Sequence, residues 1–260
     1  MNYFTQLMIV GTGLAGPAHT SAGAMAAILN ADVVYFLVSD ALTRHWLTAK
    51  RPDALDLGKE YAVGRKRTET YRAIVESLLA PLREGKRVCG AFYGHPGVFA
   101  FPTHEAIRIA RSEGIEARML PGISAEDCLF ADLGIDPGTR GCQSFEATDF
   151  LVRRRRFDPT AGLVLWQSGA IGVEDHRDER LWNREGLRVL AEVLLETYPL
   201  EHPILIYEAS SLPITGPRIA VTPVHKLADA AVTAISTLWI EPLPDRGPDR
   251  EMLRRLGLGG

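Results

Sequence analysis

The chain has 260 residues, 46% apolar and 23% charged, which is ordinary globular composition with length for one large core or two smaller ones. Its formal net charge of −3 gives no global basic field that would draw it to nucleic acid or a membrane surface. The three cysteines form no Cys-x-x-Cys pair. Together with the lack of a signal peptide or a membrane-length apolar run, this predicts a cytoplasmic protein.

The first part of the chain predicts strand, glycine loop, helix and strand over residues 7–38. The loop Gly11–Gly16 has the Gly-x-Gly-x-x-Gly spacing, with Asp40 further on, and this pattern is typical of dinucleotide binding. The alternative is a tight turn where the loop crosses another backbone. Pro17 and His19 favour that alternative, because they interrupt the helix start that a pyrophosphate requires.

The next part is predicted as loop with a short helix over residues 41–58, followed by a longer helix from about Arg67. Apolar residues recur there at helical spacing, and Gly85 ends the helix. Arg67 and Tyr71 are four residues apart, so they share one helix face. Periodicity alone leaves two interpretations open: a solvated charge beside a half-buried aromatic ring, or a functional pair.

Two glycine–proline turns follow short predicted strands. Tyr93–Phe99 comes after the strand 87–92, and Pro121–Ala125 comes after the strand 116–119. Such turns let backbone approach a ligand closely, and in open α/β sheets ligands lie beyond the carboxyl ends of the strands. We therefore expect the two turns to form opposite walls of one cofactor site. Ser124 is also a plausible N-cap for the helix that follows.

The rest of the chain again alternates strands and helices. The predicted domains are residues 1–120, an N-terminal α/β domain, residues 121–243, a C-terminal α/β domain, and residues 244–260, a polar and loosely ordered tail. The basic run Arg153–Arg156 is either a solvated helix end or loop, or a docking patch for an acidic partner. The predicted elements of the second half are strands at 143–146, 163–167, 204–207, 218–221 and 237–240, and helices at 184–198 and 224–229.

The motifs together resemble the S-adenosylmethionine-dependent tetrapyrrole methylase superfamily over about residues 5 to 241. Within it, Tyr93–Phe99 and the segment 117–133 are most similar to the borosin peptide backbone α-N-methyltransferases. Ile135–Pro137, Glu146–Leu151 and Gln167 extend this resemblance.

The resemblance implies two α/β domains of tetrapyrrole-methylase type with the cofactor in the cleft between them. It implies that S-adenosylmethionine binds at the Tyr93 turn and leaves as S-adenosylhomocysteine, while the Gly11 loop shapes the substrate side. No metal is implied, since the sulfonium leaving group is already activated. The cofactor-binding positions implied by the resemblance are Tyr93, His95, Val98, Phe99, Ser124, Ala125, Gln167, Tyr207, Ser236 and Thr237.

The family's catalytic trio falls on Tyr61, Arg67 and Tyr71. A peptide nitrogen is neither acidic nor nucleophilic, because its lone pair is delocalised into the carbonyl group. We hypothesise that Tyr71 or Tyr61, with a pKa lowered by Arg67, takes or relays the amide proton. The other groups then stabilise the imidate-like oxygen by hydrogen bonds.

The fungal members of this group carry their peptide substrate as a C-terminal extension, whereas this chain reaches only Gly260. We therefore expect the split type, which acts on a separately encoded precursor peptide. The resemblance also implies a homodimer and allows a heterotetramer with the precursor. Three alternatives remain: a methyltransferase for tetrapyrroles or other small molecules, a dinucleotide-dependent oxidoreductase using the Gly11 loop, and a silent peptide-binding homologue.

Overall fold

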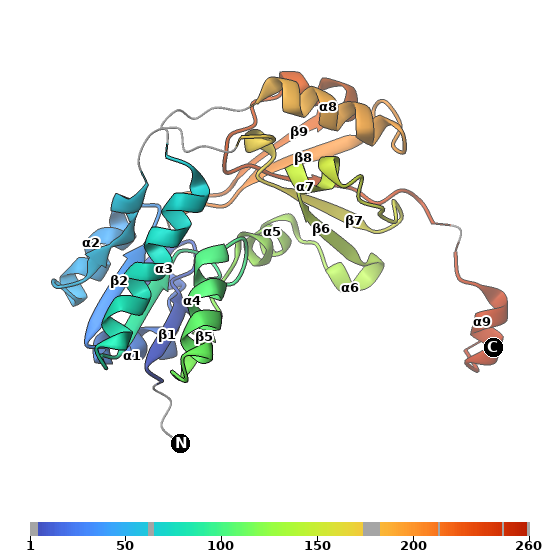
Figure 1. The fold of residues 1–260 in the computed structure, drawn as a ribbon. Helices are drawn as coiled ribbons and strands as arrows, with labels where there is room; N and C mark the ends of the chain where they lie inside the picture. The colour runs from blue at the N-terminus through green and yellow to red at the C-terminus, as the bar shows by residue number, and fades with distance from the viewer. Residues whose placement is uncertain (1–4, 62–64, 174–182, 213, 246, 259–260) are drawn as a thin grey trace. The chain divides into compact units, whose positions relative to one another are not determined.

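The computed structural model describes residues 5–61, 65–173, 183–212, 214–245 and 247–258. It contains two five-stranded sheets with helices packed on them, which confirms the predicted α/β class (Figure 1). By packing, the chain forms two compact units, each discontinuous in sequence. The first holds the described residues of Met1–Ile135, Gly172–Leu181 and Tyr207–Ile219; the second holds those of Asp136–Ile171, Trp182–Ile206 and Ala220–Gly260. The domain boundaries that the sequence predicts after residues 120 and 243 stay predictions.

The first unit is built on a parallel sheet in the order β3-β2-β4-β1-β5. Its strands are β1 (Leu7–Gly11), β2 (Val33–Leu37), β3 (Leu55–Asp56), β4 (Val88–Phe92) and β5 (Ala117–Leu120). Its helices are η1 (Gly16–Ala18), α1 (Ala22–Asn30), α2 (Ala41–Lys50), η2 (Leu57–Glu60), α3 (Arg67–Arg83), α4 (Phe101–Ser112) and α5 (Ala125–Leu133).

Alternating strand residues bury their side chains in two separate layers. Leu7 and Ile9 of β1 join the core formed with α3 and α4. Met8 and Val10 of the same strand join the core formed with α1 and α2. Because successive side chains in a strand point to opposite faces, a sheet covered on both sides needs an unbroken apolar run, as β1 has.

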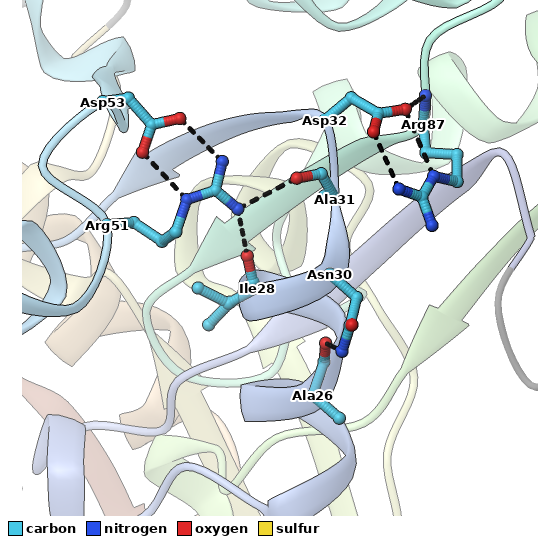
Figure 2. A network of polar contacts seen from close by, with 8 residues as sticks. All are labelled: Ala26, Ile28, Asn30, Ala31, Asp32, Arg51, Asp53 and Arg87. Carbon is cyan, nitrogen blue, oxygen red and sulfur yellow. Dashed lines mark hydrogen bonds and ion pairs between the residues drawn. The ribbon is translucent and has the colours of Figure 1, made fainter.

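An arginine–aspartate pair joins the amino ends of two neighbouring strands, and a second arginine holds the end of α1 nearby (Figure 2). Arg87, just before β4, binds the Asp32 carboxylate, just before β2, at 2.7 Å. The guanidinium holds the pKa of Asp32 at about 2. Arg51 binds the carbonyls of Ile28 and Ala31 at the end of α1. These contacts lie at the end of the sheet opposite to the predicted ligand loops.

The second unit carries the sheet β6-β7-β10-β8-β9, in which β6 and β7 are parallel and β10 runs antiparallel to β7. Its core packs the sheet against the helices α7, α8 and η4. The strands are β6 (Cys142–Glu146), β7 (Gly162–Trp166), β8 (Pro203–Glu208), β9 (Arg218–Pro223) and β10 (Thr237–Ile240). The helices are α6 (Pro137–Arg140), α7 (Ala147–Val152), η3 (Ser168–Ala170), α8 (Arg184–Leu195), η4 (Val224–Asp229) and α9 (Arg250–Arg255).

Two regions differ from the sequence-based expectation. Residues 41–50 form the ten-residue helix α2 rather than a loop with a short helix. Asp40 caps this helix through the Thr43 amide, and Leu47 packs into the core. In the polar tail, α9 forms with no buried residue. Over the described residues, no helix combines the length and apolar character that crossing a bilayer demands.

The basic run Arg153–Arg156 is largely neutralised by its neighbours. Arg153 and Arg155 bind the Asp149 carboxylate, and Arg154 binds Glu196. All four arginines are exposed. This confirms the interpretation as a solvated helix end.

Candidate functional site

The first sheet reverses its winding between β1 and β4. The two strands are neighbours, yet the helix after β1 packs on one face and the helix after β4 packs on the other. Ligands of open α/β sheets bind at the carboxyl ends of the strands at such a switch point. The loop Tyr93–Phe99 lies on this edge.

A seam of glycine backbones closes the crevice at the switch point. Gly94 donates its N–H to the Gly13 carbonyl at 2.8 Å, and Gly13 donates to the Gly94 carbonyl at 3.2 Å. A Cβ on Gly122 would lie 2.3 Å from the Gly94 oxygen, and one on Gly11 would lie 2.6 Å from the Gly122 Cα. The three loops therefore pack backbone to backbone, and a ligand must lie beside the seam.

The Gly11–Gly16 loop is filled by protein groups. The Nδ1 atom of His19 accepts hydrogen bonds from the amides of Leu14 and Ala15 at 3.3 and 3.2 Å. A Cβ on Gly16 would lie 2.1 Å from the Thr43 Oγ1. Because these amides are engaged with His19, they are not presented to a pyrophosphate. The tight-turn interpretation is confirmed, and the dinucleotide interpretation loses its structural basis.

The loop after β4 is held in shape by its own histidines. The Gly97 amide donates to the His95 Nδ1 at 2.9 Å, and the His104 Nε2 lies 2.9 Å from the Gly97 carbonyl oxygen. The buried Thr103 hydroxyl donates to the Ala100 carbonyl at 2.7 Å. His95 therefore orders the loop that carries the other predicted cofactor residues.

The same loop presents large apolar side chains to its surroundings. Tyr93, Val98, Phe99 and Phe101 are 48%, 39%, 50% and 57% exposed. An adenine ring and a methionyl chain need apolar surfaces with a few placed polar groups. The aromatic faces of this loop and the Tyr93 hydroxyl fit S-adenosylmethionine in those terms.

Backbone strain coincides with two predicted cofactor residues. Within the described part of the chain, the non-glycine residues with positive φ are Phe99 (50°), Gln167 (54°) and Arg154 (48°). Such a conformation costs about 1–2 kcal/mol and persists where the surroundings impose it, often at functional sites. Phe99 belongs to the first unit and Gln167 directly follows β7 in the second.

The predicted catalytic residues come together in the first unit. The Tyr61 hydroxyl interacts electrostatically with Tyr71, Tyr93 and the Arg67 guanidinium. Arg67 and Tyr71 lie on the first turns of α3, and the Tyr71 ring stacks on Phe101 with centroids 6.1 Å apart. The structure thus joins the predicted trio to the loop that holds the predicted cofactor residues.

Arg67 is half-buried and has no carboxylate partner or hydrogen bond among the residues that the structure describes. The other half-buried arginines are each paired: Arg51 with Asp53, Arg65 with Glu60, and Arg218 with Glu208. No described carboxylate balances the charge of the half-buried Arg67 guanidinium. Its five donors are available to a bound carbonyl or carboxylate group.

Part of the expected pKa pattern is wrong. Burial raises the pKa of Tyr61, and its neighbours Tyr71 and Tyr93 raise it further, while Arg67 lowers it by less. The net shift of the Tyr61 pKa is upward, because burial and the two tyrosines outweigh the lowering by Arg67, so the predicted net lowering is wrong for Tyr61. Tyr61 therefore stays a neutral phenol at physiological pH.

The turn before α5 forms the predicted cap. Ser124 and Asp127 form a capping box in which the Asp127 Oδ2 accepts from the Ser124 amide and hydroxyl at 2.7 and 2.6 Å. Ser124 is buried and its hydroxyl is engaged. Ala125, beside it, opens the helix.

The remaining predicted cofactor residues are buried. Tyr207 has no exposed surface and donates its hydroxyl to the Asp132 Oδ2 at 2.6 Å within the first unit. Ser236 is fully buried in the second unit, and its Oγ accepts from the Thr233 amide at 2.8 Å. Thr237 begins β10 and is 3% exposed. Their roles toward a cofactor stay predictions.

Sequence reasoning missed a cavity of about 810 Å³ in the first unit. It is lined by the loop after β1, the turn and helix after β5, and the later residues Ala209, Ser210, Leu212, Thr215 and Pro217. The spacing of Asp127 and Asp132 on one helix was visible in the sequence. The return of residues 207–219 to the first unit was not, because no local pattern encodes such a long-range contact.

Within the described residues, no group of three His, Cys, Asp or Glu side chains is arranged to hold a metal ion.

Comparisons with known proteins extend these observations. The chain is 41% identical over 256 residues to a methyltransferase/ribosomally synthesized cyclic peptide gymnopeptides precursor of Gymnopus fusipes, covering 97% of this chain and 61% of that protein. It is 39% identical to the omphalotin A precursor methyltransferase of Omphalotus olearius, with the same coverage of both. It is 40% identical to a type I borosin cyclic peptide precursor methyltransferase of Coprinopsis marcescibilis, covering 97% of this chain and 67% of that protein.

The chain spans less than two thirds of the Gymnopus and Omphalotus relatives. In fold, it is similar to uroporphyrin-III-C-methyltransferase from Thermus thermophilus, with a TM-score of 0.63 at 22% identity over 93% of this chain and 98% of that chain. A structure of that enzyme complexed with S-adenosylhomocysteine gives a TM-score of 0.62 at 21% identity, over 90% of this chain and 96% of that chain. The family model for tetrapyrrole (corrin/porphyrin) methylases matches residues 6–228. With its two sheets, its glycine seam and these matches, the chain belongs to the tetrapyrrole methylase family, and its resemblance to the borosin methyltransferases is confirmed.

Proposed function

We propose that this protein transfers methyl groups from S-adenosylmethionine to backbone amide nitrogens of a ribosomally made peptide. The observation that carries the proposal is the position of Arg67 beside Tyr61, Tyr71 and Tyr93, which we call the tyrosine cluster. Arg67 is half-buried and has no partner among the described residues. The relatives at about 40% identity, which are named methyltransferase and cyclic peptide precursor together, support the same substrate class.

The chemistry assigns different roles to the clustered side chains. Tyr61, held neutral, and Arg67 donate hydrogen bonds to the amide oxygen as negative charge develops on it. Tyr71 accepts the N–H proton as its own proton passes to water, so the phenol ends neutral. The nitrogen lone pair forms the new N–C bond. When bound, S-adenosylmethionine supplies an electrophilic methyl group whose bonding pair returns to sulfur.

The loop Tyr93–Phe99 positions the methyl donor in this proposal. Tyr93, Val98 and Phe99 give apolar contact, and His95 keeps the loop in shape. The proposed cofactor set is completed by Ser124, Ala125, Gln167, Tyr207, Ser236 and Thr237. Holding the nitrogen close to the methyl carbon supplies much of the rate acceleration.

The small-molecule alternative has less support. The similarity to uroporphyrin-III-C-methyltransferase is 22% in sequence and extends to the fold alone. The homodimer, the separately encoded precursor and the cytoplasmic location stay predictions.

Mass spectrometry tests the proposal. The purified protein is mixed with S-adenosylmethionine and overlapping synthetic peptides from the part of the Gymnopus relative that lies outside the matched segment. A second set of peptides comes from short reading frames beside the gene. We expect mass increments of one methylene that fragmentation places on backbone nitrogens. A protein that binds S-adenosylhomocysteine and methylates a porphyrinogen but none of the peptides would overturn the proposal.

A further inference from the structure

The cavity of about 810 Å³ is a second feature of the edge that carries the tyrosine cluster. It belongs to the first unit and lies on the β1 and β5 side of the glycine seam, whereas Tyr93 follows β4. Its volume falls within the range of about 300–1,000 Å³ that is usual for ligand pockets. The roles proposed above assign no ligand to it, although two of its walls, the Gly11–Gly16 loop and the Pro121–Ala125 turn, were expected to border the substrate and the cofactor.

The charge of the cavity is one-sided. Asp127 and Asp132 line it, and no lysine or arginine among the described residues does. His19 lines it as well, and its Nδ1 accepts hydrogen bonds from the Leu14 and Ala15 amides. Within the same part of the chain, neither carboxylate takes part in an ion pair. Burial, together with Asp132 and Asp127, raises the pKa of the Cys128 thiol in the same wall to about 11, so that thiol stays neutral. The cavity therefore complements a positive charge.

Both carboxylates are fixed in position. Asp132 accepts from the hydroxyl of the fully buried Tyr207, and Asp127 is held by the Ser124 cap. Fixed carboxylates bind a cation at a lower entropic cost than mobile surface acids do. Asp132 also keeps its second oxygen without a hydrogen bond to any residue that the structure describes.

The other walls are largely apolar. Pro121, Ile123, Leu212 and Pro217 line the cavity. Ile123 and Leu212 are 39% and 38% exposed. A long side chain that carries an apolar stem and a cationic head matches this combination, since lysine and arginine bury their methylenes beside apolar surface.

The distance to the tyrosine cluster sets the position of such a residue in a peptide. Tyr93 follows β4, and the cavity walls follow β1 and β5, the next two strands along the edge. Neighbouring strands lie about 4.8 Å apart and extended chain rises about 3.3 Å per residue. A peptide that crosses the edge therefore moves about three residues from one feature to the other.

Resting on the proposed function, we infer that this cavity is a subsite for a lysine or arginine side chain of the substrate peptide, about two to four residues from the amide that is methylated. The cavity thus selects peptides by charge at a position away from the reacting nitrogen.

The test uses two readouts on the full chain. Fluorescence anisotropy measures the affinity of labelled peptides that differ only by Lys, Gln or Glu, placed in turn at each position within four residues of the central amide. Mass spectrometry measures methylation of the same peptides. The variant Asp132→Asn removes the charge but keeps an oxygen that accepts from Tyr207. Glu76→Gln on the exposed face of α3 is the matched control for loss of one negative charge.

We expect the Lys peptide to bind about threefold to tenfold more tightly than the Glu peptide at one register, in keeping with a partly open ion pair. Asp132→Asn should reduce this ratio to about twofold or less, while Glu76→Gln leaves it unchanged. S-adenosylhomocysteine affinity should be the same in all three proteins. Equal binding of Lys and Glu peptides at every position would overturn the inference, as would a loss of cofactor affinity in Asp132→Asn. Charge-selective binding without methylation would instead overturn the proposed function and leave the subsite standing.

Discussion

Gly94 and Gly122 approach so closely that a methyl group on Gly122 would lie 2.3 Å from the Gly94 carbonyl oxygen. The contact joins the loops after β4 and β5 without any side chain between them. It makes the position of the proposed cofactor loop depend on the turn that opens α5.

Gly122→Ala should therefore destabilise the first unit. The added Cβ meets backbone atoms, which cannot turn aside as a flexible side chain could, and overpacking of this kind costs about 1–3 kcal/mol. Urea unfolding measures the loss. Gly216→Ala is the control, since a Cβ there meets nothing within 4 Å. Equal stability of the two variants would show that the seam is not tightly packed.

Arg67→Ala should slow methyl transfer by about a hundredfold or more, the usual effect of removing one donor to a developing oxyanion. Because Arg67 has no partner among the described residues, the free energy of unfolding and the affinity for S-adenosylhomocysteine should stay unchanged. Urea unfolding, isothermal titration and the mass assay measure the three quantities. Arg72→Ala, at an exposed position of the same helix, is the matched control. Wild-type turnover in Arg67→Ala would remove this residue from the mechanism.

Phe99→Gly separates strain from binding. Phe99 holds a φ of 50° with half of its side chain exposed, and glycine adopts this conformation freely. The free energy of unfolding should stay level or rise by up to about 1 kcal/mol, while S-adenosylhomocysteine binds more weakly. Arg154→Gly relieves a similar φ of 48° in the second unit and should leave cofactor affinity unchanged. Unaltered affinity in Phe99→Gly would mean that the side chain does not contact the cofactor.

Local signals in the sequence predicted most strands and helices of the first unit. Continuous apolar runs mark β1 and β4, and Ser124 with Asp127 marks the start of α5. The helix α2 escaped this reasoning because its polar surface residues mask a narrow buried face formed by Thr43 and Leu47.

The site depended on information that periodicity does not carry. Arg67 and Tyr71 share a helix face, but nothing local shows that Tyr61 and Tyr93 approach them or that Arg67 lacks a partner among the described residues. The family resemblance predicted that Tyr61 acts together with Arg67 and Tyr71, and the structure showed that Arg67 lacks a partner among the described residues. The upward pKa shift of Tyr61 needed the structure, since burial outweighs the effect of a neighbouring guanidinium.

A thermal-shift comparison separates the methylase from the oxidoreductase alternative. S-adenosylhomocysteine at about 100 times its Kd should stabilise the protein by about 2.7 kcal/mol and raise its Tm accordingly. NAD should give no shift, because His19 occupies the Leu14 and Ala15 amides of the glycine loop. Stabilisation by NAD alone would reverse the assignment of that loop.

The stability of the protein should fall as the pH rises above about 10. Tyr61 has a raised pKa in the folded protein, so the unfolded chain loses its phenolic proton from about pH 10 while the folded protein keeps it. The contribution of Tyr61 to the free energy of unfolding is therefore fully present below about pH 10 and is lost as the pH rises further. Burial of Tyr198, whose pKa is raised to about 12, acts in the same direction.

Tyr61→Phe should remove the part of the pH dependence of the free energy of unfolding that comes from Tyr61. Between about pH 9 and pH 11 the parent protein should lose up to about 1 kcal/mol more than the variant, allowing for the partial exposure of Tyr61. Urea unfolding at both pH values measures the difference. Identical slopes in parent and Tyr61→Phe would show that the Tyr61 hydroxyl remains in contact with solvent, and would return it to the candidates for the catalytic base.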